Sequence, residues 1–85
     1  MNKDNVMFHL REAKEGLENL VYDVESDEEY HESDLAQAMA QIYFHLNTAW
    51  NSRNASQKDI DEGSEDNFRL WKRFPDDDEL SFGDE

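Results

Sequence analysis

The stretch LAQAMAQIYFHLNTAWNSRN, residues 35–54, carries the clearest helical pattern in the chain. Residues spaced alternately four and three apart fall on one face of a helix. Here that face contains Leu35, Met39, Ile42, Leu46, Ala49 and Arg53. Ala38, Tyr43 and Trp50 broaden its apolar part. The spacing predicts a helix over residues 35–54 whose apolar residues, Leu46 included, pack into a core.

The same stretch is free of acidic residues. From Leu35 to Lys58 there is no Asp or Glu, although the chain holds 22 acidic residues against 8 Lys and Arg. Charged side chains are mostly found exposed to water. A helix without acids, in so acidic a chain, is therefore expected to turn little of its surface to bulk water.

A second helix is predicted over residues 4–25, where Asp4 or Asn5 is the expected N-cap. The same four-and-three spacing recurs there in Val6, Leu10, Ala13, Leu17, Leu20 and Val24. Met7 and Val21 widen this apolar stripe. Gly16 is a poor helix former in the middle of the segment. Either a close helix crossing or simple tolerance explains it.

Two acidic connectors and a tail surround these segments. Residues 26–34, SDEEYHESD, hold five acidic residues and no Lys or Arg. Ser26 with Glu29 fits a capping box, and Ser33 or Asp34 fits a later helix start; the sequence leaves these alternatives open. Residues 55–66 form the second connector. Residues 76–85 form an acidic tail that we expect to be mobile.

A short third helix is predicted over residues 65–74, with Pro75 ending it. Its apolar residues are Phe68, Leu70, Trp71 and Phe74. The predicted fold is all-α: an antiparallel hairpin of two helices, with the third helix covering one open side through Trp71 and Phe74. One helical domain should span residues 1–75. The breadth of the acid-free helix suggests a second contact surface, best explained by a homodimer that forms a four-helix bundle.

Nothing in the sequence indicates catalysis, a metal or a cofactor. There is no Cys, no Gly-x-Ser-x-Gly element and no phosphate-binding glycine loop. Glu28 and His31 have the spacing of one half of a di-iron element, but the other carboxylates are missing. His45 borders the apolar stripe, which is typical of a histidine at the edge of a core. We therefore expect no enzymatic activity and predict no catalytic residue.

The net charge of the chain makes two classes of partner unfavourable. A net charge of −14 and a pI near 4.3 disfavour nucleic acids and anionic membranes, which attract Lys and Arg. No apolar run approaches the length needed to span a bilayer. The N-terminus is polar and does not resemble a signal peptide. A cytoplasmic protein with a protein partner is the expectation.

The candidate binding residues are the uncharged polar and aromatic side chains of residues 44–54: Phe44, Asn47, Trp50, Asn51 and Asn54. Asn is a mediocre helix former, so something should offset its cost. Either the helix frays toward a turn after Asn51, or these groups face a protein interface where buried charge would be costly.

Two non-enzymatic functions remain open at this point, and a metal or proton-transfer enzyme that would use His45 with Glu28 and His31 is the third and least supported hypothesis. The first is a small adaptor or regulatory protein that binds another protein and associates with itself. The second is an acidic inhibitor, of the immunity or DNA-mimic kind, that covers a basic site on its target. The candidate acidic surface for the second comprises Asp27, Glu28, Glu29, Asp76, Asp77 and Asp78.

Overall fold

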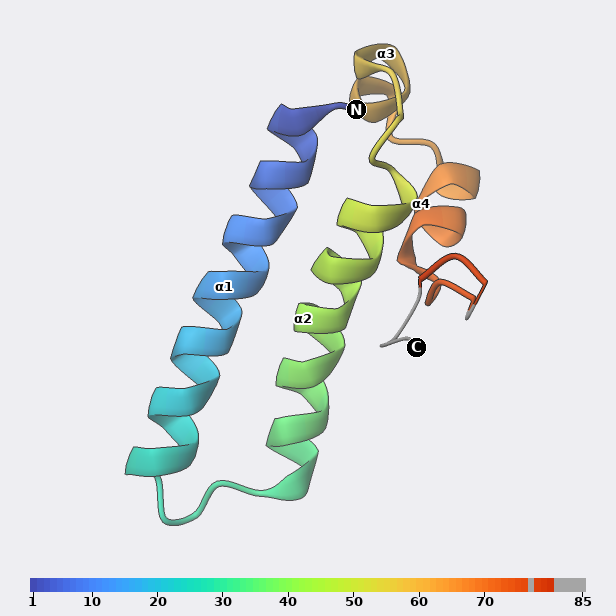
Figure 1. The fold of residues 1–85 in the computed structure, drawn as a ribbon. Helices are drawn as coiled ribbons and strands as arrows, with labels where there is room; N and C mark the ends of the chain where they lie inside the picture. The colour runs from blue at the N-terminus through green and yellow to red at the C-terminus, as the bar shows by residue number, and fades with distance from the viewer. Residues whose placement is uncertain (77, 81–85) are drawn as a thin grey trace.

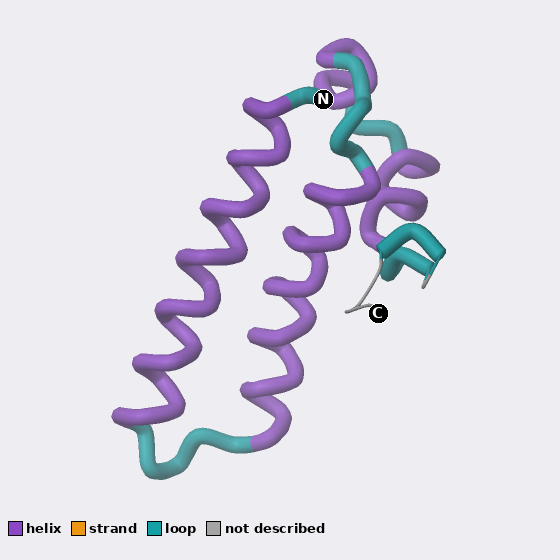
Figure 2. The backbone as a smooth tube through the Cα atoms, viewed as in Figure 1, coloured by secondary structure: helices purple, strands orange, loops and turns teal. Residues whose placement is uncertain are grey.

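The computed structural model describes residues 1–76 and 78–80, and over these residues the protein is all-α (Figures 1 and 2). Two long helices, α1 (Lys3–Ser26) and α2 (Glu32–Asn51), form an antiparallel hairpin. Two short helices follow, α3 (Gln57–Glu62) and α4 (Glu65–Lys72). The predicted hairpin and the short third helix, which is α4, are confirmed. Helix α3 was not predicted.

Helix α1 begins one residue earlier than expected, and Asn2 caps it. The Asn2 side-chain oxygen accepts a hydrogen bond from the Asn5 backbone N–H at 3.2 Å. The predicted caps, Asp4 and Asn5, lie inside the first turn, so that prediction was wrong. The Asn2 backbone N–H also donates to the Arg53 carbonyl at 2.6 Å. This bond ties the start of α1 to the turn after α2.

The connector between α1 and α2 is shorter than predicted. Ser26 is the last residue of α1, and its hydroxyl donates to the Tyr22 carbonyl, so the capping box from Ser26 to Glu29 is not formed. Helix α2 starts after His31, whose backbone N–H donates to the Asp34 carboxylate at 3.1 Å. Asp34 therefore stabilises the start of α2 from inside its first turn.

The core between α1 and α2 is small. Among the described residues its buried hydrophobic members are Ala13, Leu20, Ile42 and Ala49. Two of these are alanines, which allow the helices to approach closely. Gly16 lies at the same crossing: a Cβ atom there would be 3.3 Å from Ile42 Cγ1. The close crossing explains the glycine inside α1.

Leu46 does not lie in this core. Its exposed fraction is 42% in the single chain, so the prediction that it is buried was wrong. The four-and-three spacing gives the centre of an apolar stripe, but one neighbouring helix covers only part of so broad a stripe. Leu46 falls on the part that α1 leaves uncovered.

Helix α3 occupies the connector that was expected to be irregular. The Ser56 hydroxyl accepts from the Asp59 backbone N–H at 3.1 Å, and Gly63 ends the helix with φ of 54°. This left-handed conformation suits glycine. A helix of six residues is too short to show an apolar period in its sequence, which is why the pattern did not predict it.

Helix α4 packs against α2 on the side away from α1 (Figure 1). Ser64 caps its start by accepting from the Asn67 backbone N–H at 3.1 Å. The helix ends at Lys72, two residues before the predicted end, and Pro75 follows. Trp71 is half-buried, as its predicted packing role requires. Phe74 remains largely exposed, with its ring edge against Tyr43 at 5.2 Å between centroids.

None of the four helices in the described part combines the length and apolar character needed to cross a membrane. In the tail, Asp76, Asp78, Glu79 and Leu80 are described. The expectation of a mobile tail concerns residues that lie mostly outside the described part.

Candidate functional site

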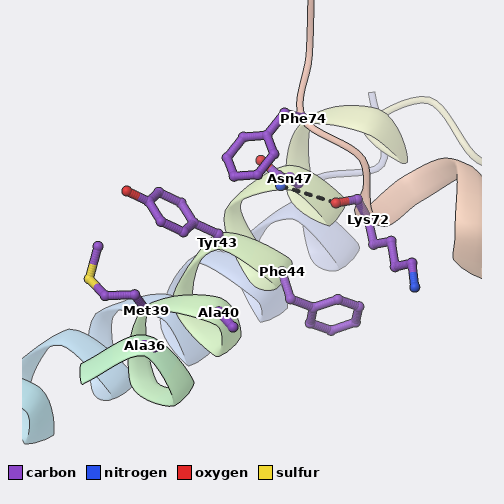
Figure 3. Close-up of a pocket in the computed structure, with 8 residues that line it drawn as sticks. All are labelled: Ala36, Met39, Ala40, Tyr43, Phe44, Asn47, Lys72 and Phe74. Carbon is purple, nitrogen blue, oxygen red and sulfur yellow. Dashed lines mark hydrogen bonds between the residues drawn. The ribbon is translucent and has the colours of Figure 1, made fainter. Parts of the chain in front are cut away.

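Two of the candidate amides hold α4 in place by binding its last carbonyl groups. Asn47 Nδ2 donates to the Lys72 carbonyl at 3.0 Å (Figure 3). Asn51 Nδ2 donates to the Trp71 carbonyl at 2.8 Å and to the Arg73 carbonyl at 2.6 Å. The last carbonyls of a helix have no partner inside that helix. The docking of α4 therefore offsets the helix-forming cost of these asparagines.

The remaining candidate residues lie in different surroundings. The Phe44 ring contacts Phe68 of α4, with 5.4 Å between centroids. The Arg53 guanidinium lies over the Trp50 ring, with its Cζ atom 3.7 Å from the ring centroid. Asn54 is exposed in the turn after α2. The structure thus does not bring all five candidates to one free surface. That they bind another protein stays a prediction.

A shallow groove of about 390 Å³ runs along the outer side of α2 (Figure 3). Helix α2 supplies most of its lining, and the end of α4 closes one side. The lining residues are Ala36, Met39, Ala40, Tyr43, Phe44, Asn47, Lys72 and Phe74. We call it the outer groove. Its lining is mostly apolar, so an apolar side chain would fit it better than a charged one.

A pair of histidines links α1 and α2 beside α4. His9 Nδ1 and His45 Nδ1 are 3.0 Å apart, which is hydrogen-bond distance. One of these nitrogens must carry hydrogen and the other must offer a lone pair. The contact therefore requires at least one neutral imidazole. Nothing in the sequence indicates that His9 and His45 are in contact, because they lie 36 residues apart in the chain.

The surroundings of this pair favour the neutral form of His9. Burial lowers the pKa of His9 below its ordinary value, the charge of His45 lowers it further, and Glu12 opposes both effects. Burial acts first because a charged imidazole loses hydration in a partly apolar site. Protonating both rings would place two positive charges against each other.

A smaller cavity of about 190 Å³ lies next to the pair, where α1, α2, α3 and α4 meet. We call it the histidine cavity. Its lining residues are Asn5, His9, Phe44, Thr48, Ile60, Gly63, Ser64, Phe68 and Trp71. The Thr48 hydroxyl is buried without a hydrogen-bond partner in the described structure. The cavity thus combines aromatic walls with polar groups, among them the Thr48 hydroxyl and the His9 ring.

A further apolar surface is formed by half-exposed side chains of both α1 and α2. The helical period places them away from His9 and His45. Its members are Val6, Leu10, Leu17, Val21 and Val24 of α1, with Leu35, Leu46 and Trp50 of α2. We call it the open face. Leu10, Leu17, Val21, Val24, Leu35 and Leu46 are each between 39% and 51% exposed.

The open face is hollowed at its end near the N-terminus. A cavity of about 200 Å³ there is lined by Met1, Val6, Leu10, Leu46, Ala49, Trp50 and Arg53. Arg53 reaches this cavity because its guanidinium stacks on Trp50 and donates to the Trp50 carbonyl at 2.7 Å. A positive charge is therefore fixed beside an apolar hollow.

The opposite end of the hairpin is strongly acidic. Seven acidic residues and no Lys or Arg occupy residues 23–34, the end of α1, the loop and the start of α2. Asp27, Glu28 and Glu29 are exposed there, as expected for an acidic surface. Of the tail candidates, Asp76 and Asp78 are exposed, and Asp77 lies outside the described residues.

No group of three His, Cys, Asp or Glu side chains that is suited to a metal ion occurs among residues 1–76 and 78–80. Glu28 and His31, which have the spacing of half a di-iron element, lie in the loop and at the cap of α2. They are therefore not on one helix face, as such a site requires.

Comparison with protein-family models, with curated proteins and with solved structures finds no match to this chain. The candidate sites therefore rest on their own geometry.

Sequence reasoning missed the open face and the role of the amides. A signal for the first was present: Leu10, Leu17 and Val21 extend the stripe of α1 beyond the width that one neighbouring helix covers. No local signal pointed to the second. Asn47 and Asn51 bind carbonyl groups 25 and 20 residues ahead in the chain, and only the packing of α4 brings them together.

Proposed function

We propose that the chain is a small, non-enzymatic protein-binding protein that associates with a second copy of itself through the open face. The observation that supports this is the continuous row of half-exposed Leu and Val side chains along both helices of the hairpin. Contiguous apolar patches of this kind on a soluble protein are typical of protein–protein contacts. The cytoplasmic location expected from the sequence belongs to the same proposal.

The small core supports the proposal. A chain of 85 residues buries a limited share of its surface, and two of the four buried hydrophobic residues here are alanines. Complete burial of a Leu or Val side chain contributes about 1.5 to 3 kcal/mol. The Leu and Val side chains of the open face are only half-buried in a single chain, so much of this free energy of burial is not gained there. Association would recover it, because two open faces bury each other.

The size of the open face also suits a dimer. Helix α1 has 24 residues, so the face is about 36 Å long at 1.5 Å per residue. Two helices side by side, each about 10 Å across, make its area roughly 700 Å². Stable protein interfaces bury about 800 Å² on each partner.

The test is the mass in solution, measured by light scattering on a size-exclusion column over a range of concentrations. The wild-type chain should have twice its mass of 10.1 kDa. Leu17→Glu places a charge in the middle of the open face and should give a folded monomer. Asn19→Glu, an equally exposed position on another side of α1, is the control and should remain dimeric. A monomeric wild type at every concentration would refute self-association.

The acidic inhibitor remains a second candidate, and one observation favours it: the seven acidic residues at the loop end of the hairpin. A basic target surface would be attracted to this end. Such binding should weaken strongly between low and high salt, because exposed charge pairs are screened. Binding through the open face should survive high salt. The acids do not form long, regularly spaced rows along the helices, which speaks against a DNA mimic.

A further inference from the structure

The open face has charges of opposite sign at its two ends. The loop end carries the seven acidic residues of residues 23–34 without a single base. At the far end the basic groups are Lys3, Arg53 and the N-terminal amine, which the hydrogen bond from Asn2 to the Arg53 carbonyl brings together. The one acid of that turn, Asp4, points about 100° away from Lys3 around the helix.

The far end keeps its positive charge beside the open face. Arg53 lines the hollow between Val6, Leu10 and Leu46, and its stacking on Trp50 holds the guanidinium there. Among the described residues, no acidic residue lines this hollow, whereas Arg53 does.

Two symmetric arrangements bring two open faces into contact. In the parallel one, both loop ends lie at the same end of the bundle. In the antiparallel one, each loop end lies against the far end of the other copy. A symmetric interface repeats every contact twice, so an unfavourable or favourable pairing of the ends also counts twice.

We propose that two copies pair face to face in the antiparallel orientation, with the acidic loop end of each beside Lys3 and Arg53 of the other. The inference rests on the self-association proposed above and adds the relative orientation of the two copies. The parallel arrangement would bring the two acidic loop ends, each with seven acidic residues, to the same end of the bundle. Charges within about 8 Å of each other act in spite of physiological salt, and those flanking a packed interface lie in that range.

The absence of cysteine makes the orientation directly measurable, because a single introduced cysteine carries the only spin label. Two exposed positions mark the two ends: Glu28→Cys in the loop and Asn54→Cys in the turn after α2. Distances between labels are measured by pulsed electron spin resonance. Circular dichroism and light scattering on each labelled variant verify that it is folded and dimeric.

In the antiparallel dimer, labels at Glu28→Cys should lie at least about 36 Å apart, the length of α1. A mixture of the two labelled variants should add a short distance, below about 25 Å, since the two ends then face each other across two helix layers. A short distance between Glu28→Cys labels alone would overturn the orientation while leaving the dimer intact. A monomeric mass would instead refute the proposed function.

Two charge-reversal variants test whether pairing of opposite charges stabilises the dimer. Lys3→Glu removes a base beside the open face, whereas Lys58→Glu makes the same change of net charge on α3, which does not line the hollow of the open face. The dissociation constant of the dimer, measured by sedimentation equilibrium, should rise several-fold for Lys3→Glu and remain near the wild-type value for Lys58→Glu. Equal effects of the two variants would show that net repulsion alone governs association, and would overturn the charge pairing.

Discussion

At the scale of the residue, the surroundings of His9 determine which protonation state of its ring the folded chain favours. Its Nδ1 lies 3.0 Å from His45 Nδ1, and its pKa is lowered by burial, then by His45, against the opposing effect of Glu12. In the unfolded chain the pKa of His9 returns to its ordinary value near 6.5. Folding therefore favours the neutral ring.

This linkage predicts a loss of stability in mildly acidic solution. Because the pKa of His9 is lower in the folded state, the contribution of the neutral ring is fully present above pH 6.5 and is lost as the pH falls below it. The measurement is the free energy of unfolding in urea between pH 7.5 and 5. His9→Asn should flatten this dependence, and the exposed His31→Asn should not. An unchanged slope in His9→Asn would contradict the assignment.

At the scale of the element, α4 is held by hydrogen bonds as well as by apolar contact. It has only eight residues, too few for a stable isolated helix. Asn51 satisfies two of its terminal carbonyls and Asn47 a third. The amides are thus the reason why so short a helix can dock on α2.

Replacing Asn51 should therefore loosen α4. We expect Asn51→Ala to lower the free energy of unfolding by about 1 to 3 kcal/mol, since two hydrogen bonds are lost and two carbonyls keep no partner inside the protein. Asn54→Ala, the same change at an exposed position, should stay within about 0.5 kcal/mol of wild type. Urea unfolding measures both values, and hydrogen exchange should show faster exchange in α4 for Asn51→Ala alone. Similar behaviour of the two variants would mean that the amide contacts contribute little.

At the scale of the whole molecule, thermal stability should depend on protein concentration. If the open faces bury each other, mass action raises the melting temperature of the wild type with concentration. Leu46→Ala removes apolar surface from the open face and should reduce this rise, whereas Ile42→Ala, in the core of the single chain, should cost about 2 to 5 kcal/mol at every concentration. Calorimetry at several concentrations tests this. A wild-type melting temperature that does not change with concentration would contradict it.

The sequence-based predictions were accurate where a feature depends on residues close together in the chain, and they were wrong or missing where it depends on distant contacts. The two long helices and α4 were predictable because apolar spacing over several turns is a property of neighbouring residues. Helix α3 was not, because six residues hold less than two turns. The cap at Asn2 was missed because residues near a helix start offer several competing caps, and contacts with the turn at Arg53 favour one of them.

The sequence by itself determined that this protein is helical, strongly acidic and built around two long amphipathic segments, because charge and apolar period are local properties. Only the tertiary structure decided which part of each broad stripe is buried. Helix α1 contacts α2 at Gly16 and Ile42. Asn47 and Asn51 donate hydrogen bonds to carbonyl groups at the end of α4. Leu17, Val21 and Leu46 remain uncovered. The physical reason is that a helix presents several faces at once, and which of them is covered depends on partners distant in the chain.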